Sequence, residues 1–132
     1  MIQNSGESLA YLGDCIYELE IRTFLISLGI TKVDILHKTA ITFTSAVAQA
    51  SILDYLLEEN ILTESEIAVY KRGRNSNHTA NRRKIERAAY QKSTGFEAVI
   101  GFLYLSNEKE RAIEIIKKSI EYIRSSKNGE ES

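Results

Sequence analysis

The sequence predicts one all-α domain, and three observations support this. The chain has 132 residues, of which 43% are hydrophobic, so it can bury one core and has little room for a second. It contains no proline, the residue that most often interrupts helices. Apolar residues recur at three- and four-residue spacing, and no segment alternates as a half-buried strand does. We expect a helical domain over residues 1–124 and a disordered tail over the polar residues 125–132.

The first part of the chain predicts two long helical segments. Residues 7–28 place apolar side chains on a helical stripe, and Gly29 follows where such a helix would end. Residues 33–58 carry the same periodicity. Because the run 39–44 is rich in β-branched residues, we expect a break there between a short helix and a longer one.

Capping motifs mark the start of later helices. Thr63 and Glu66 form a capping box, which predicts a helix from about residue 64 to about residue 72. Gly73 and the polar run 74–83 are expected to form a loop, with helix resuming over about 82–91.

The C-terminal part predicts two helices rich in apolar residues. Residues 94–106 should form a strongly apolar helix. Asn107 and Glu110 make another capping box, which would open an amphipathic last helix. That helix carries four isoleucines on one stripe: Ile113, Ile116, Ile120 and Ile123.

The net charge of −1 conceals an uneven distribution of charge. Residues 1–70 carry three basic and ten acidic side chains, whereas residues 71–92 carry eight basic ones and a single acid, Glu86. This basic island indicates either a local contact with a polyanion or an ordinary solvated loop, and charge alone does not decide between them. The island comprises Lys71, Arg72, Arg74, Arg82, Arg83, Lys84, Arg87 and Lys92.

Several classes of protein are disfavoured. The N-terminal residues lack the basic and apolar regions of a secretory signal, and no apolar run is long enough for a membrane helix. A single cysteine, Cys15, cannot form an internal disulfide, and it has no nearby histidine that would make it a nucleophile. His37 and His78 lack zinc-like partners. We expect a cytoplasmic protein without a membrane segment.

Two acidic residues stand out because apolar residues surround them. Asp14 interrupts the stretch from Leu9 to Tyr17, and Glu97 interrupts the stretch from Gly95 to Leu103. A buried carboxylate must be paired, capped or bound to a cation. Two such acids brought together would suit a hard cation such as Mg²⁺. The alternatives are that Asp14 is a surface residue and that Glu97 completes a capping box with Thr94.

Glu18 lies one helical turn beyond Asp14, and Arg22 lies one turn beyond Glu18. The two acids would repel each other across one helix face, a repulsion that either a cation or Arg22 would relieve. We favour a structural ion pair between Glu18 and Arg22.

Five short blocks occur along the chain in the order found in one family: Leu9–Glu18, Leu36–Lys38, Ser45–Ala50, Lys71–Asn75 and Ser93–Gly101. Together they resemble Mini-ribonuclease III, a reduced relative of ribonuclease III, over residues 7–124. The resemblance implies the all-helical, homodimeric ribonuclease III catalytic fold without a separate RNA-binding domain. It also implies Mg²⁺-dependent cleavage of both strands of double-stranded RNA, leaving 5′-phosphate and 3′-hydroxyl ends.

By this resemblance Asp14 and Glu97 are the catalytic residues and the metal ligands. The family's cellular task is maturation of the large-subunit (23S) ribosomal RNA precursor, for which a large-subunit ribosomal protein is a candidate accessory partner. Full-length ribonuclease III has four acids in these two signatures. Here Ala10 and Thr94 stand in place of two of them, a loss that Mini-ribonuclease III members share.

The basic island is then expected to grip the RNA duplex through its phosphates and 2′-hydroxyls. We expect this role for Lys71, Arg72, Arg74, Asn75, Arg82, Arg83, Lys84 and Arg87. A competing interpretation is an RNA- or ribosome-binding module with weak or no catalysis, which the two lost acids favour. A helical protein-interaction domain would leave the basic island unexplained.

Overall fold

Six helices account for almost all of the chain that a computed structural model describes, residues 4–76 and 84–131. They are α1 (Gly6–Ser27), α2 (Val33–Thr44), α3 (Ala46–Glu58), α4 (Glu64–Asn75), α5 (Lys84–Leu105) and α6 (Lys109–Glu131). Those two stretches contain no strand, which confirms the all-α fold class.

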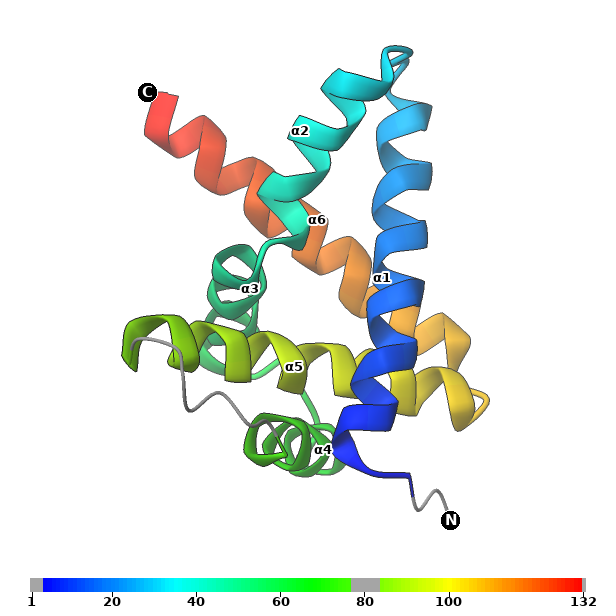
Figure 1. Cartoon of the computed structure of the whole chain (residues 1–132), viewed down its shortest axis with the longest axis vertical. Coiled ribbons are helices and arrows are strands. Elements are labelled where there is room, and N and C mark those ends of the chain that lie inside the picture. Colours follow the sequence, from blue (N-terminus) through cyan, green and yellow to red (C-terminus); the bar gives the residue numbers. More distant parts are fainter. Residues whose placement is uncertain (1–3, 77–83, 132) are drawn as a thin grey trace.

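Helix α5 lies at the centre of the domain and packs against α1, α3, α4 and α6 (Figure 1). Its apolar residues supply much of the core, with Phe96, Val99, Ile100 and Leu103 almost fully buried. Helix α6 adds a buried stripe through Ile116, Ile120 and Ile123, as its isoleucine spacing predicts. The core therefore forms around one helix that touches most of the others.

One expected helix start and one expected helix end are confirmed in detail. The Thr63 hydroxyl accepts a hydrogen bond from the Glu66 backbone N–H, and the Glu66 side chain accepts one from the Thr63 N–H. This reciprocal capping box begins α4. At the end of α1, Gly29 has φ of 89°, a left-handed conformation that favours glycine.

The expected break at residues 39–44 was wrong in its position. These residues are helical and complete α2, and the break falls at Ser45. The Thr42 and Thr44 hydroxyls donate to backbone carbonyls one turn earlier, which accommodates them in the helix. The Ser45 side chain accepts a hydrogen bond from the Ala48 N–H at 3.1 Å and so begins α3.

Residues 73–75 and 92–93 were also assigned wrongly from the sequence, since all of them are helical. Residues 77–83 of the expected loop lie outside the described residues. Gly73 lies inside α4, because the absence of a side chain lets α4 approach Gly95 and Ala98 of α5. Residues 84–105 form one continuous helix rather than two, so Thr94 does not begin a helix. Its hydroxyl donates to the Tyr90 carbonyl oxygen at 3.0 Å, as threonines do within helices.

Asn107 does not cap α6 as expected. It adopts a left-handed φ of 63° in the turn that follows α5, and α6 begins at Lys109. The backbone of α6 is helical as far as Glu131, and so through most of the segment 125–132. The division into a domain over residues 1–124 and a disordered tail stays a prediction.

Within the described residues, no single helix is both long and apolar enough to cross a membrane. Helices α2 and α3 are long and apolar enough only when taken together, and the pair is bent by 43° where they join.

Candidate active site

Helices α1 and α5 meet backbone to backbone at two glycines. A Cβ atom added at Gly13 would overlap the carbonyl oxygen of Glu97, and one added at Gly101 would overlap that of Leu9. Only glycine permits such an approach of two helices. The crossing brings Asp14, the residue after Gly13, beside Glu97.

A cleft of about 260 Å³ opens where these two helices cross. The carboxylates of Asp14 and Glu97 both line it, so the structure brings together the two acids singled out in the sequence. Its other lining residues are Glu7, Ala10, Tyr11, Tyr90 and Thr94. Ala10 and Thr94, which replace the two family acids, therefore face the same cleft.

The electrostatics of Glu97 reflect crowding of negative charge. Burial, a hydrogen-bond contact with Asp14 and the charge of Asp14 together raise the pKa of Glu97 to about 8, and a hydrogen bond from Gln49 opposes this shift. A cation between the two acids would relieve their repulsion and lower the pKa of Glu97 again.

The alternatives for the two acids can now be compared with their positions. Glu97 does not complete a capping box, because α5 is continuous through residue 94. Asp14 is exposed, as a surface residue would be, yet its side chain faces a cleft that also contains a half-buried carboxylate. This placement distinguishes it from an isolated surface acid.

The donor set suits Mg²⁺, which binds oxygen ligands and usually keeps several waters while using one or two protein carboxylates. Among residues 4–76 and 84–131, no group of three or more His, Cys, Asp or Glu side chains is arranged to hold a metal ion. Two carboxylates would thus leave most coordination positions to water or to substrate phosphate. The crowded pair of acids is the feature that fits a divalent cation.

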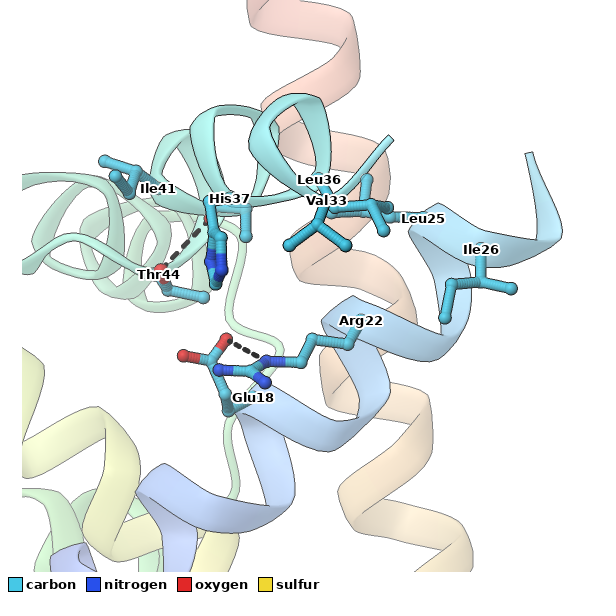
Figure 2. A pocket seen from close by; sticks show the side chains of 10 residues that line it. Glu18, Arg22, Leu25, Ile26, Val33, Leu36, His37, Ile41 and Thr44 are labelled. Carbon is cyan, nitrogen blue, oxygen red and sulfur yellow. Dashed lines mark hydrogen bonds and ion pairs between the residues drawn. The ribbon is translucent and has the colours of Figure 1, made fainter. Parts of the chain in front are cut away.

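Glu18 forms the expected ion pair with Arg22, with 3.6 Å between Arg22 Nε and Glu18 Oε2 (Figure 2). This separation is too long for a hydrogen bond. Glu18 lines a different cavity of about 320 Å³, between α1 and α2, whose walls are mainly apolar. Glu18 therefore does not line the cleft that contains Asp14 and Glu97, but its charge also raises the pKa of Glu97.

The first part of the basic island lies at the C-terminal end of α4, close to the start of α1. The Arg72 guanidinium donates to the backbone oxygen of Asn4, and the Arg74 guanidinium lies over the Tyr70 ring at 5.5 Å. Lys71 and Asn75 are exposed on the same helix. Because Gly73 packs against α5 beside Thr94, this end of α4 lies next to the cleft.

The second part of the island begins α5. Arg87 precedes Tyr90, Thr94 and Glu97 at three- and four-residue spacing, so these four lie towards one face of the helix. Lys84 lies about one turn before Arg87. Arg82 and Arg83 lie outside the described residues.

Lys92, the last member of the island, does not extend this basic surface. Its ammonium group pairs with the Asp54 carboxylate at 3.0 Å.

The sequence did not identify Gln49 as part of this site. Gln49 is 2% exposed, and its Nε2 donates to Glu97 Oε2 at 3.3 Å. Gln49 had the same feature as the two acids, since it is a polar residue within an apolar stretch, here that of α3. Glu7, Tyr11 and Tyr90 were missed because only the packing of α1 on α5 places them at the cleft.

Comparisons with known proteins agree with this fold. The Ribonuclease III domain family model matches residues 7–108. The chain is 43% identical to the Mini-ribonuclease 3 of Enterococcus faecalis over 121 residues, 92% of each chain. It is 46% identical to that of Acholeplasma laidlawii over 120 residues, 91% of this chain and 94% of the relative.

A solved structure extends the agreement to three dimensions. The X-ray structure of a Fusobacterium nucleatum protein superposes with a TM-score of 0.79 and 32% identity, covering 90% of this chain and 93% of that one. With sequence and fold in agreement over nine-tenths of its length, the chain belongs to the ribonuclease III family, in its Mini-ribonuclease III branch, and is an endoribonuclease.

Proposed function

We propose that this endoribonuclease cleaves double-stranded RNA with Mg²⁺, in maturation of the 23S ribosomal RNA precursor in the bacterial cytoplasm. The observation that carries the proposal is the meeting of Asp14 and Glu97 in one cleft at the α1–α5 crossing. Their mutual repulsion favours a shared divalent cation. The cellular role rests on the resemblance to Mini-ribonuclease III.

Asp14 and Glu97 would hold the metal, one from each helix. A bound Mg²⁺ supplies charge relief at the phosphate and lowers the pKa of a water nucleophile. Attack of water on phosphorus would form the new P–O bond of the 5′-phosphate and break the bond to the 3′ oxygen, which would take up a proton released by the water and leave as a 3′-hydroxyl. The glycine contacts at the crossing hold the backbones of α1 and α5 close together, so that both carboxylates can reach the same cleft.

The basic residues at the end of α4 and the start of α5 would hold the RNA duplex. They flank the cleft along α5, so a bound strand could run from Lys84 and Arg87 towards Glu97. A-form RNA presents phosphates and 2′-hydroxyls across a shallow minor groove, which such residues grip by shape and charge. We include Arg82 and Arg83 in this role on their sequence position alone.

A homodimer would allow both strands to be cut, since one site cuts one strand and a two-fold axis supplies a second. An exposed apolar stripe on α1 supports this. Tyr11, Leu19 and Ile26 lie on one helix face, with Leu19 61% and Ile26 62% exposed. Exposed Val33 and Ile41 of α2 line the neighbouring cavity together with Ile26 (Figure 2). Apolar surface of this extent suits a second copy of the chain.

The test of the proposed function uses long duplex RNA with and without Mg²⁺. Asp14→Asn and Glu97→Gln should each reduce the cleavage rate by more than about 100-fold, because an amide binds a hard cation poorly. Folding and metal-free duplex binding should stay near normal. Glu58→Gln, which removes an exposed carboxylate at the end of α3, is the matched control and should cut normally.

The same experiment tests the alternative of a binding module with weak or no catalysis, which rests on the loss of acids at positions 10 and 94, a loss that Mini-ribonuclease III members share. Duplex RNA that is bound but stays intact in Mg²⁺ would establish the binding module. Equal cleavage of duplex DNA would contradict recognition through A-form shape and 2′-hydroxyls.

A further inference from the structure

Gln49 is buried in contact with the proposed metal ligand Glu97. It lies on α3, is 2% exposed, and reaches across to α5, where its Nε2 donates to Glu97 Oε2 at 3.3 Å. The same Nε2 donates to the Thr44 carbonyl oxygen at the end of α2, at 3.2 Å. One amide nitrogen thus ties Glu97 to the junction of α2 and α3.

Gln49 Oε1 is buried and has no hydrogen-bond partner among the described residues. An unsatisfied buried acceptor is unfavourable, whereas an apolar side chain of similar length would not bury one. The Thr44 carbonyl oxygen can only accept, so the amide nitrogen and not the amide oxygen must face it.

The hydrogen bond from Gln49 constrains the carboxylate in a specific way. Glu97 lies within a continuous helix, and its side chain has three rotatable bonds that the α5 backbone does not fix. A donor at one carboxylate oxygen restricts these rotations and holds the group beside Asp14 in the cleft. Because the donor belongs to α3, the orientation of Glu97 depends on a helix that contributes no ligand of its own.

We propose that Gln49 is a positioning residue for Glu97: its buried amide orients the carboxylate towards the metal that Glu97 and Asp14 share. This inference rests on the proposed function, because it takes Glu97 to be a metal ligand. Hydrogen-bond partners of ligating carboxylates commonly determine how well the ligands bind their ion.

The test replaces Gln49 by Met, which has similar length and no donor. The Mg²⁺ concentration for half-maximal cleavage should rise about 10- to 100-fold, and kcat at fixed Mg²⁺ should fall, while KM for duplex RNA stays unchanged. Without RNA, the Mg²⁺-induced increase in melting temperature should shrink, because weaker binding stabilises the folded state less. That second measurement reports on the metal independently of activity.

The matched control is Ser51→Ala, on the same helix. It removes the hydrogen bond between Ser51 Oγ and Tyr122 Oη, 2.5 Å apart, on the side of α3 that faces α6. A purely structural loss should lower the melting temperature and leave the Mg²⁺ dependence unchanged. If Gln49→Met folds poorly, Gln49→Asn provides the second variant: it keeps a polar amide but is one methylene too short to reach Glu97, so the same change in Mg²⁺ dependence is expected.

Two results would distinguish a failure of the positioning role of Gln49 from a failure of the proposed function. If Glu97→Gln is inactive but Gln49→Met and Gln49→Asn keep a Mg²⁺ dependence within about twofold of the parent, the positioning role of Gln49 is overturned and the proposed function stands. If Glu97→Gln cleaves normally, Glu97 is not a ligand, and both proposals fall together.

Discussion

At the scale of single residues, Gly13 and Gly101 determine how closely the two helices of the site approach. Each glycine lies where any side chain would overlap a carbonyl oxygen of the other helix. Asp14 follows the first glycine, and Glu97 precedes the second by four residues. The residues proposed for chemistry therefore depend on neighbours that have no functional groups at all.

We predict that Gly13→Ala destabilises the protein by about 3 kcal/mol or more, the upper range for an overpacked site, because α1 and α5 must separate. Denaturant unfolding would measure this. Gly29→Ala is the comparison, since nothing lies within 4 Å of its Cβ position and only its φ of 89° is unfavourable, a cost of about 1–2 kcal/mol. Equal midpoints for the two variants would show that separating the helices costs no more than the unfavourable φ at position 29, which would contradict this prediction.

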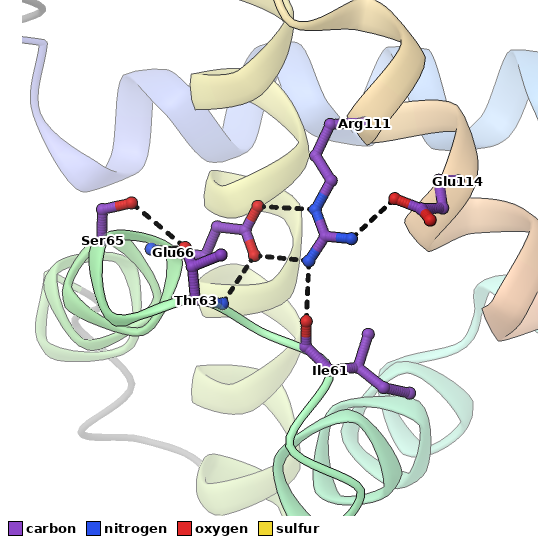
Figure 3. A network of polar contacts seen from close by, with 6 residues as sticks. All are labelled: Ile61, Thr63, Ser65, Glu66, Arg111 and Glu114. Atoms are coloured by element: carbon purple, nitrogen blue, oxygen red, sulfur yellow. Dashed lines mark hydrogen bonds and ion pairs between the residues drawn. The ribbon is translucent and has the colours of Figure 1, made fainter.

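At the scale of helices, an ion pair connects the start of α4 to α6 (Figure 3). The Arg111 guanidinium donates to both oxygens of Glu66, at 2.8 and 2.9 Å, and also to the carbonyl oxygen of Ile61 and the carboxylate of Glu114. Glu66 is 3% exposed, and it still serves the capping box with Thr63. The Glu66 carboxylate thus caps the start of α4 and also binds Arg111 of α6.

This pair predicts a loss of stability in acid. Burial favours the neutral form of Glu66, but hydrogen bonds from Arg111 and from the Thr63 backbone outweigh it and lower the pKa below 4.5. A lowered pKa stabilises the folded state above the ordinary pKa, and this contribution disappears as pH falls through the folded value. The free energy of unfolding should therefore decrease below about pH 4.5, and less steeply in Glu66→Gln.

The Arg111→Met variant tests the same pair at neutral pH. Its free energy of unfolding should fall by about 2–3 kcal/mol, less than the 3–5 kcal/mol of a fully buried pair because Arg111 is partly exposed.

The acid prediction has its own contrary outcome. If the stability of Glu66→Gln falls with pH as steeply as that of the parent, other carboxylates cause the loss of stability in acid.

The sequence predicted helix boundaries correctly where contacts between residues close in sequence determine them. The capping box of α4 involves neighbours in sequence and was predicted correctly. Gly73 and the continuity of α5 were not, because packing of α4 on α5 determines both. Asp14 and Glu97 were identified because acids in apolar stretches are conspicuous, whereas the contact of Gln49 depends on how α3 crosses α5.

At the scale of the whole molecule, the apolar stripe on α1 predicts a dimer. Leu19→Lys should place a charge in the interface and shift the protein to monomer in sedimentation experiments. Leu105→Lys, at the exposed end of α5, is the control for adding a charge at an exposed leucine and should leave the assembly unchanged. A parent protein that sediments as a monomer at the concentrations used for cleavage would contradict the dimer.

The distribution of charge over the molecule predicts how RNA binding responds to salt. Removing one side chain that binds a phosphate should reduce the slope of log affinity against log salt by roughly one unit. Lys71→Ala is the simplest variant, because Arg72 and Arg74 also interact within the protein, with Asn4 and Tyr70.

We therefore expect weaker binding and a slope lower by about one for Lys71→Ala, and a larger reduction for the triple alanine variant at positions 71, 72 and 74. Binding would be followed by titration of duplex RNA at several salt concentrations without divalent metal, so that cleavage does not interfere. Lys117→Ala, on α6 away from the cleft residues, should match the parent. If the triple alanine variant has the same slope as the parent and as Lys117→Ala, the end of α4 is an ordinary solvated surface, and the duplex must be held elsewhere.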